Sequence, residues 1–346
     1  MRDLKYLLAY IPPLLAFLGL YFQGIWAFST VVFTFGLIPV LELFTPNSQA
    51  NFSEKDRAIR LSNRFFDILL YMNVPVVYGL VLYFLYILNT HILQTYEYIG
   101  LVLSVGIILG ASGINVGHEL GHRKSIFERF LAKLLLLPSM YVHFFIEHNR
   151  GHHKHVATPR DPASSRYNES LFFFWFRSVI FSYLGAWNIE RGRLKRMKQS
   201  FWSVKNEMLV LQLVQLTYVV AIILLSATWL NAVLVFLAGI VGFLLLETVN
   251  YIEHYGLQRK KLPSGAYERV RPIHSWNSNH EVGRILLYEL TRHSDHHYIA
   301  SKKYQILDHH DQAPQLPFGY PAAMLAALVP PLWFKVMNRR VDEVRG

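Results

Sequence analysis

Six long apolar runs constrain the fold of this 346-residue chain more than any other feature of its sequence. A helix needs roughly 20 apolar residues to cross the ~30 Å hydrocarbon core of a bilayer, and only 16% of the residues are charged. We therefore predict an all-α integral membrane protein of one domain, residues 1–346, with six transmembrane helices. The predicted helices cover residues 7–22, 27–44, 65–88, 98–116, 208–225 and 232–249.

The placement of the 34 Lys and Arg residues supports the same count of helices. Three wholly non-basic stretches, each with two apolar runs and a short turn, separate four basic groups at residues 2–5, 55–64, 123–205 and 259–345. Basic residues collect on the cytoplasmic side of a bacterial inner membrane. We therefore predict that both termini and the two large polar regions, 117–207 and 251–346, are cytoplasmic.

Three other apolar segments are not expected to span the membrane. Residues 131–146 are interrupted by Pro138, which favours a buried or re-entrant helix. Residues 171–187 mix aromatic side chains with a base, which is typical of a helix lying in the membrane interface. Residues 318–337 hold several prolines, which disfavour a spanning helix. We expect no cleavable signal, because the first run contains two adjacent prolines and no small-residue cleavage site follows it.

The chain contains no cysteine, which excludes disulfides, thiolate metal sites and a fused rubredoxin-type iron centre with its four thiolates. If the chain carries out a reaction that needs electrons, another protein must therefore supply them. The formal net charge is +11, but no nucleic-acid-binding motif is present and the bases lie between membrane spans. We attribute this excess of bases to membrane topology, because bases collect in the cytoplasmic loops. The alternative is that the bases attract an acidic partner protein to the cytoplasmic face.

Sixteen histidines are present, and nine of them form four sets near the predicted cytoplasmic ends of the spans. These are His118 and His122; His148, His152 and His153; His254; and His293, His296 and His297. Nine imidazoles are enough for two metal ions. With no thiolate available, such sites suit iron, zinc, copper or nickel. Zinc has no redox chemistry, so a metal pair beside a lipid-facing cavity favours iron and the activation of oxygen.

Helix periodicity predicts how each set is oriented. Residues four apart share one face of an α-helix, so both imidazoles of the first set can point to one ion. By the same spacing His148 aligns with His152, while His153 turns in a different direction. His293 can share a face with the two histidines that lie three and four residues after it.

Five carboxylates near the histidines are candidates for orienting them: Glu119, Glu147, Asp161, Glu253 and Asp295. Adjacent residues on a helix do not face each other. We therefore expect an acid next to a histidine in sequence to hydrogen-bond a histidine of another set, as metal ligands commonly require. Glu119 also permits a different hypothesis. A histidine, glutamate and histidine at this spacing form the zinc-protease signature, in which the glutamate is a general base.

Beyond composition and spacing, the motifs resemble a known family. Residues 118–122, 147–153 and 293–297 resemble the three histidine boxes of membrane fatty-acid desaturases and alkane hydroxylases. Several segments are similar to the alkane 1-monooxygenase pattern: EHNRGHH at 147–153 with 156–159 and 161–162, NYIEHYG at 250–256, HSWNSNH at 274–280, RHSDHH at 292–297 and LPFGYP at 316–321.

This resemblance implies an enzyme that hydroxylates the terminal methyl group of medium-chain n-alkanes with O2, and two non-haem Fe ions held by the nine histidines. It also implies rubredoxin as electron donor, reduced by an NADH-dependent rubredoxin reductase. His274 and His280 belong to a shared motif without being ligands, so we expect them to be structural or part of the electron-entry surface. His155 stands where relatives often carry an acid, which affects the charge presented to the donor.

Alternatives remain open at this stage. A hydroxylase of aromatic methyl groups such as xylene, or a fatty-acyl desaturase, would use similar histidines. A zinc intramembrane protease would carry one zinc, and a metal transporter would place its ligands within the spans. For the alkane hypothesis, Thr34 lies between two phenylalanines in the second run and is a candidate for lining the substrate channel.

Overall fold

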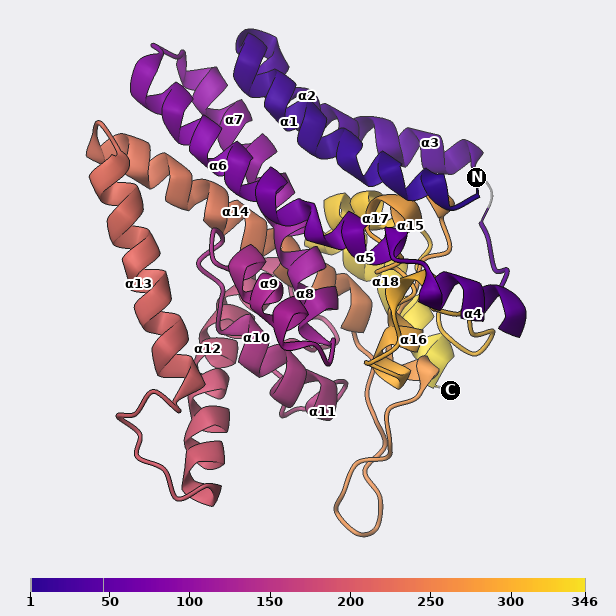
Figure 1. The fold of residues 1–346 in the computed structure, drawn as a ribbon. Helices are drawn as coiled ribbons and strands as arrows, with labels where there is room; N and C mark the ends of the chain where they lie inside the picture. The colour runs from indigo at the N-terminus through magenta and orange to yellow at the C-terminus, as the bar shows by residue number, and fades with distance from the viewer. Residues whose placement is uncertain (1, 46, 346) are drawn as a thin grey trace. The chain divides into compact units, whose positions relative to one another are not determined.

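The computed structural model describes residues 2–45 and 47–345, and within these residues the protein is helical with isolated β-bridges but no strand (Figure 1). Six stretches are long and apolar enough to cross a membrane, which confirms the predicted number. They are Asp3–Phe22 with α1 (Ile11–Phe22), Gly24–Phe44 with α2 (Ser29–Val32) and α3 (Ile38–Phe44), Phe65–Thr90 with α5 (Phe65–Tyr71) and α6 (Asn73–Thr90), Thr95–Gly121 with α7 (Thr95–Ile108) and α8 (Asn115–Gly121), Glu207–Leu225 (α13), and Trp229–His254 (α14).

The other helices are shorter, apart from α12. They are α4 (Glu54–Ser62), α9 (Ile126–Leu136), α10 (Phe144–Glu147), α11 (His153–His155), α12 (Leu171–Arg196), α15 (Glu281–Leu286), α16 (His293–Tyr298), α17 (Tyr320–Ala327) and α18 (Pro330–Arg345). The apolar run around Pro138 is interrupted between α9 and α10. Helices α17 and α18 are bent by 119° relative to each other, so they form a continuous apolar stretch only as a broken pair.

The chain divides into two compact units. Unit 1 contains the described parts of Met1–Gly36, Asp67–Glu147 and Tyr183–Leu246, and unit 2 those of Leu37–Phe66, His148–Ser182 and Glu247–Gly346.

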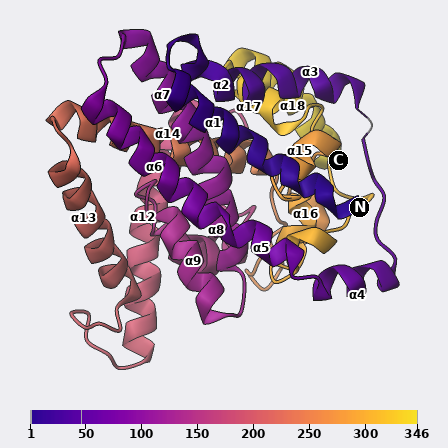
Figure 2. The same ribbon diagram turned by 45° about the horizontal axis from the view of Figure 1, so that its top comes forward.

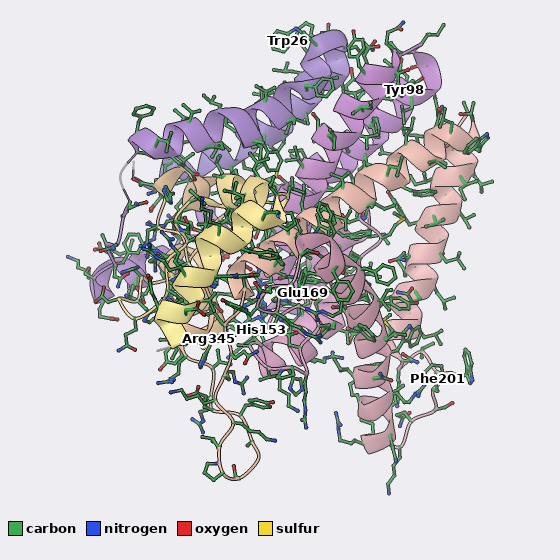
Figure 3. The ribbon with its side chains drawn as sticks, turned by 180° about the vertical axis from the view of Figure 1, so that it is seen from behind. Trp26, Tyr98, His153, Glu169, Phe201 and Arg345 are labelled. Atoms are coloured by element: carbon green, nitrogen blue, oxygen red, sulfur yellow. The ribbon has the colours of Figure 1, made fainter. Side chains whose placement is uncertain are left out.

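Unit 1 is a packed set of long helices in which α1 lies against α6 and α7 (Figure 2). A methyl group on Gly106 of α7 would lie 2.5 Å from Val241 of α14, so these two helices approach through a glycine. Small residues permit such close approach between spanning helices. Trp26 and Tyr98 lie at the same end of this unit (Figure 3). Aromatic residues of this kind are enriched at membrane–water interfaces.

Unit 2 holds its short helices together with polar side chains. The fully buried Arg292 donates hydrogen bonds to the carbonyls of Leu307 (2.6 Å) and Ala50 (2.9 Å), which ties the start of α16 to two loops. Helices α15 and α17 both pack against α3, and α16 packs against the 3-10 turn Pro272–His274. Short helices are marginal by themselves, so these tertiary contacts position α16 and its histidines.

Candidate metal centre

The second histidine set lies on a π-helical turn, His148–His152, that leads into α11. The predicted alignment of His148 with His152 holds for the rings, whose centroids lie 5.0 Å apart in a stacked arrangement, but the prediction that His153 turns in a different direction is wrong. Backbone hydrogen bonds join residues five apart in a π turn and four apart in an α-helix. His148 meets His153, five residues later, with 3.0 Å between their Nε2 atoms. His152 faces a different group of histidines. The three rings therefore lie close together, while their ring nitrogens are divided between two groups.

One group in unit 2 combines three segments that are distant in the chain. His152 and His297 have Nε2 atoms 3.2 Å apart, and the Nε2 atoms of His293 and His254 are 3.3 Å apart. All four side chains are buried. Ring nitrogens this close cannot all carry protons, so they converge as lone-pair donors. That arrangement is suited to a cation.

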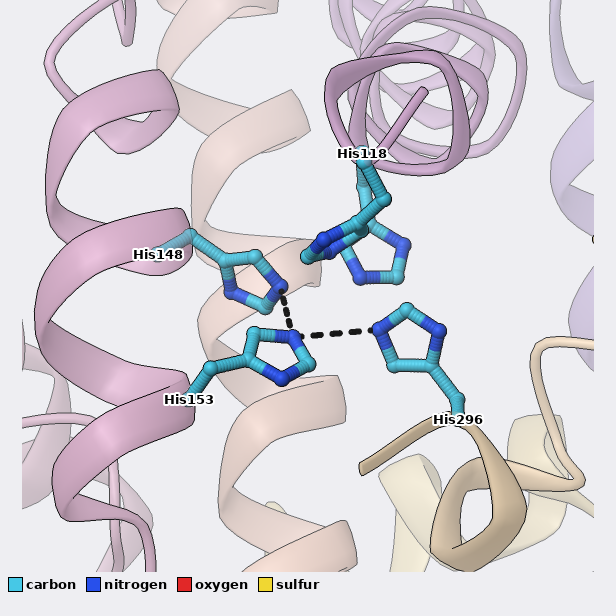
Figure 4. Close-up of side chains that lie close together, drawn as sticks. His118, His148, His153 and His296 are labelled. Carbon is cyan, nitrogen blue, oxygen red and sulfur yellow. Dashed lines mark hydrogen bonds between the residues drawn. The ribbon is translucent and has the colours of Figure 1, made fainter. Parts of the chain in front are cut away.

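A second convergence in unit 2 involves His148, His153 and His296 (Figure 4). The Nε2 atom of His296 lies 3.2 Å from that of His153. His296 and His297 are adjacent on α16 and belong to different groups. Burial lowers the pKa of His296 to about 3 and holds the pKa of His297 well below its usual value. Both rings are therefore neutral near pH 7, which is the form that binds a metal.

The first histidine set lies in unit 1, at the end of α8. The rings of His118 and His122 are 4.9 Å apart, as expected for residues four apart on a helix. Their neighbour Glu119 accepts a hydrogen bond from Arg123 at 2.7 Å, and Arg123 also lies 3.4 Å from Asp67. The side chain of Glu119 is thus held by a base one helical turn away.

Asp161 directly contacts His152, one of the four histidines of the first group. Its Oδ2 atom lies 2.8 Å from Nδ1 of His152 and accepts a hydrogen bond from the Ser164 hydroxyl at 2.5 Å. Its Oδ1 atom accepts from the backbone N–H of Ala163 at 3.1 Å. Burial by itself would raise the pKa of Asp161, but the charge and hydrogen bond of His152 and the Ser164 hydroxyl outweigh it and lower the pKa. The carboxylate therefore fixes the orientation of His152.

Asp295 has a different set of partners. Its Oδ1 atom lies 2.7 Å from Nε2 of His310, and its Oδ2 atom lies 2.7 Å from both the Lys302 ammonium and the backbone nitrogen of Asp308. His310 is not one of the nine histidines. Asp295 therefore anchors α16 to the following loop.

Glu253 lies between a tyrosine and a histidine. Its Oε1 atom accepts a hydrogen bond from the Tyr320 hydroxyl at 2.7 Å, and its Oε2 atom lies 3.1 Å from Nε2 of His293. This contact is on the same ring nitrogen that faces His254, so the carboxylate lies on the metal side of the histidine. Glu147, the remaining acid, is buried at the end of α10.

Sequence reasoning missed two residues that support the site, Ser164 and Tyr320. Each binds a carboxylate that contacts a histidine. Tyr320 lies in the LPFGYP segment that carries part of the family resemblance, so a signal was present in the sequence. Ser164 follows Asp161 by three residues, a spacing that permits the hydroxyl contact but does not reveal it.

The other predicted histidines have local partners. His274 is buried, accepts from the Arg271 backbone N–H at 3.0 Å and lies 3.3 Å from Glu268, and burial lowers its pKa. Nδ1 of His280 lies 2.9 Å from the Ser278 hydroxyl. Thr34 lies in a second π turn, Phe33–Leu37, and its hydroxyl oxygen has no hydrogen-bond partner among the described residues.

Comparison with known proteins places this geometry in a family. Residues 93–324, more than half of the chain, match the family model described as Fatty acid desaturase. The chain is 39% identical over 345 residues to Alkane 1-monooxygenase 1 of Alcanivorax borkumensis, covering 98% of this chain and 84% of that protein. It is 41% identical over 309 residues to Alkane 1-monooxygenase of Pseudomonas putida, covering 89% and 76%. The chain belongs to the alkane 1-monooxygenase family.

A more distant relative is the hydroxylase component of the xylene/toluene monooxygenase of Pseudomonas putida. It is 27% identical over 354 residues, covering 98% of this chain and 89% of that protein. Together with the six apolar helices, family membership identifies an oxidoreductase that is a multi-pass membrane protein.

Proposed function

We propose that this chain is a membrane-bound, non-haem di-iron monooxygenase that converts medium-chain n-alkanes to primary alcohols. The observation that carries the proposal is the convergence of imidazole nitrogens from three distant segments of unit 2, in a chain without cysteine. An all-imidazole donor set fits iron among the redox metals. The relatives named alkane 1-monooxygenase support the substrate class.

We assign the nine histidines as the ligands of two irons. One iron would be held by His152, His254, His293 and His297, and His148, His153 and His296 would contribute to the other; His118 and His122 complete the nine. When bound, the iron pair supplies the activation of dioxygen and the insertion of one oxygen atom into a C–H bond.

The neighbouring carboxylates prepare these rings. Asp161 accepts a hydrogen bond from the Nδ1–H of His152, which leaves the Nε2 lone pair for the metal. Tyr320 directs Glu253 so that its second oxygen lies beside Nε2 of His293. In this position the carboxylate can hold a proton next to the reacting groups.

An alkane has no polar group by which it can be oriented. Selectivity for the chain end therefore requires a narrow apolar channel that stops the chain with its methyl group at the metal. Thr34 is our candidate for lining this channel, because it is a small residue between Phe33 and Phe35 in the second span.

Electrons are proposed to come from rubredoxin, which an NADH-dependent rubredoxin reductase reduces. The absence of cysteine supports an external donor, since the chain cannot build its own thiolate centre. The positions of the basic residues support an inner-membrane location, with both termini and the histidine-rich regions on the cytoplasmic side.

A hydroxylase of aromatic methyl groups is the second candidate, supported by the 27% identity to the xylene/toluene enzyme. The identities of 37–41% to alkane 1-monooxygenases favour the alkane substrate. Product analysis with octane and xylene in competition separates the two.

The test is the metal content of the purified protein, together with an assay that converts octane to 1-octanol using rubredoxin, its reductase and NADH. We expect two irons per chain and formation of 1-octanol. One zinc per chain without oxygen consumption contradicts the proposal and favours the protease hypothesis.

A further inference from the structure

Unit 2 contains a basic pocket of about 580 Å³ between the end of α14 and the C-terminal end of α18. The charged residues of its wall are five bases and one acid: Arg259, Lys260, Lys261, Arg271, Arg345 and Glu268. Much of the wall belongs to a projecting loop after α14 (Figure 1), closed by a bridge between Lys261 and Tyr267. The pocket is therefore a concave surface with a strong excess of positive charge.

Two of the bases hold the pocket together. Arg259 donates hydrogen bonds to the carbonyls of Glu268 (2.7 Å) and Lys154 (3.0 Å), which ties the loop to the segment after the π turn. Arg345, labelled in Figure 3, donates to the carbonyl of Gly256 at 2.6 Å. These hydrogen bonds end on carbonyl oxygens, so they do not neutralise the positive charge of either side chain.

The exposed bases are available to a partner. Lys260 and Lys261 are exposed and form no ion pair among the described residues. Arg271 is exposed as well, and it pairs with Glu268 at 2.8 Å. Exposed cations on a projecting rim attract a negatively charged surface over several ångströms and accelerate its association.

The pocket leads toward the histidines. A second cavity of about 360 Å³ shares wall residues with it, including Leu257 and Arg345, and extends to Asp161 and Ser164. Asp161 lies 2.8 Å from Nδ1 of His152. One carboxylate therefore separates the basic surface from a histidine of the candidate metal centre.

We infer that this pocket is the docking site of an acidic electron-donor protein. The inference rests on the proposed function, in which one atom of O2 enters a C–H bond and the other leaves as water, consuming two electrons and two protons. The chain has no cysteine from which to build a relay of its own, so a donor protein must approach the centre. The basic pocket offers charge complementarity and proximity at one place.

Binding of an acidic rubredoxin to the metal-free protein in zwitterionic nanodiscs tests the site. The variant is Lys260→Glu with Lys261→Glu, and the matched control is Lys195→Glu with Arg196→Glu, which makes the same charge change at exposed positions of α12. We expect the loop variant to raise Kd about tenfold or more at low salt and to lose that difference in high salt. The control should change Kd less than about twofold. Equal effects of both variants, or no effect of either, overturn the inference.

Two further measurements separate this inference from its alternatives and from the proposed function. The iron-loaded loop variant, Lys260→Glu with Lys261→Glu, should lose the formation of 1-octanol with rubredoxin as reductant. It should retain the formation of 1-octanol with dithionite as reductant. If wild-type protein makes no alcohol with either reductant, the proposed function fails while the Kd comparison still decides the docking site. If the loop variant loses binding to phosphatidylglycerol vesicles and keeps rubredoxin binding, the pocket is a lipid-headgroup site and the inference is wrong.

Discussion

Asp161 and Asp295 are both buried close to the candidate metal centre, yet they stabilise different parts of it. Asp161 lies nine positions from His152 in sequence and binds its ring directly. Asp295 is adjacent to a histidine in sequence, and it binds Lys302 and His310. The comparison teaches that proximity in sequence does not predict which acid orients a histidine, because neighbouring residues on a helix point in different directions.

Of the substitutions that test this comparison, Asp161→Asn should have the largest effect, a loss of metal affinity. The amide removes the negative charge that orients His152, and loss of such a partner typically weakens metal binding about 10–100-fold. Iron retained during titration with a chelator measures the effect. Asp311→Asn is the control, because the Asp311 side chain is 98% exposed. Iron retention equal to that of the wild type would show that Asp161 does not hold the ring.

Changing Asp295→Asn should affect folding more than metal affinity. It removes the charge that binds Lys302 and His310 and weakens the anchor of α16, a loss of about 1–3 kcal/mol. Thermal unfolding of the metal-free protein in detergent should shift to lower temperature. Unchanged unfolding together with release of iron would place Asp295 in the same role as Asp161.

Changing Ser164→Ala tests the Asp161 region with a smaller perturbation. The Ser164 hydroxyl donates to Asp161 and accepts from the Ala157 backbone N–H at 2.8 Å. Its loss should cost about 1 kcal/mol and weaken iron retention less than Asp161→Asn. Ser170→Ala is a suitable comparison, since Ser170 contacts no carboxylate near the histidines among the described residues. A loss as large as that of Asp161→Asn would assign the orienting role to the hydroxyl.

The smallest expected effect is a pH dependence in the Asp295 region. Burial alone would raise the pKa of Asp308, but hydrogen bonds from Arg57 and Lys302 lower it. A folded-state pKa below the unfolded value means that the stabilisation is complete above about pH 4 and is lost as the pH falls through the folded value. Unfolding midpoints between about pH 6 and pH 3 should therefore fall less steeply in Asp308→Asn than in the wild type. Parallel profiles would contradict this assignment.

Much of the fold followed from local properties of the sequence. The six spans were predictable because a helix must be long and apolar to cross a bilayer, and the basic residues mark the connections between spans. Residues 318–337 were predicted not to form a spanning helix because prolines cluster there, and the structure breaks this segment between α17 and α18. The first histidine set kept its predicted spacing because α8 is a regular helix there.

The arrangement of the second histidine set was not predictable from spacing. A π turn is a small change in backbone hydrogen bonding that has no strong residue signature, and it moved His153 to the side of His148. The roles of Ser164 and Tyr320 were also hidden. Each depends on where a carboxylate lies after folding, and neither carboxylate is adjacent to them in sequence.

The sequence by itself determined the membrane class, the number of spans, the absence of thiolate chemistry and the identity of the histidine sets, because all of these depend on composition and local periodicity. Only the tertiary structure decided how His148, His152 and His153 divide between two groups and which acid binds which partner. The geometry of those contacts depends on a π turn and on the packing of loops, which no local pattern records.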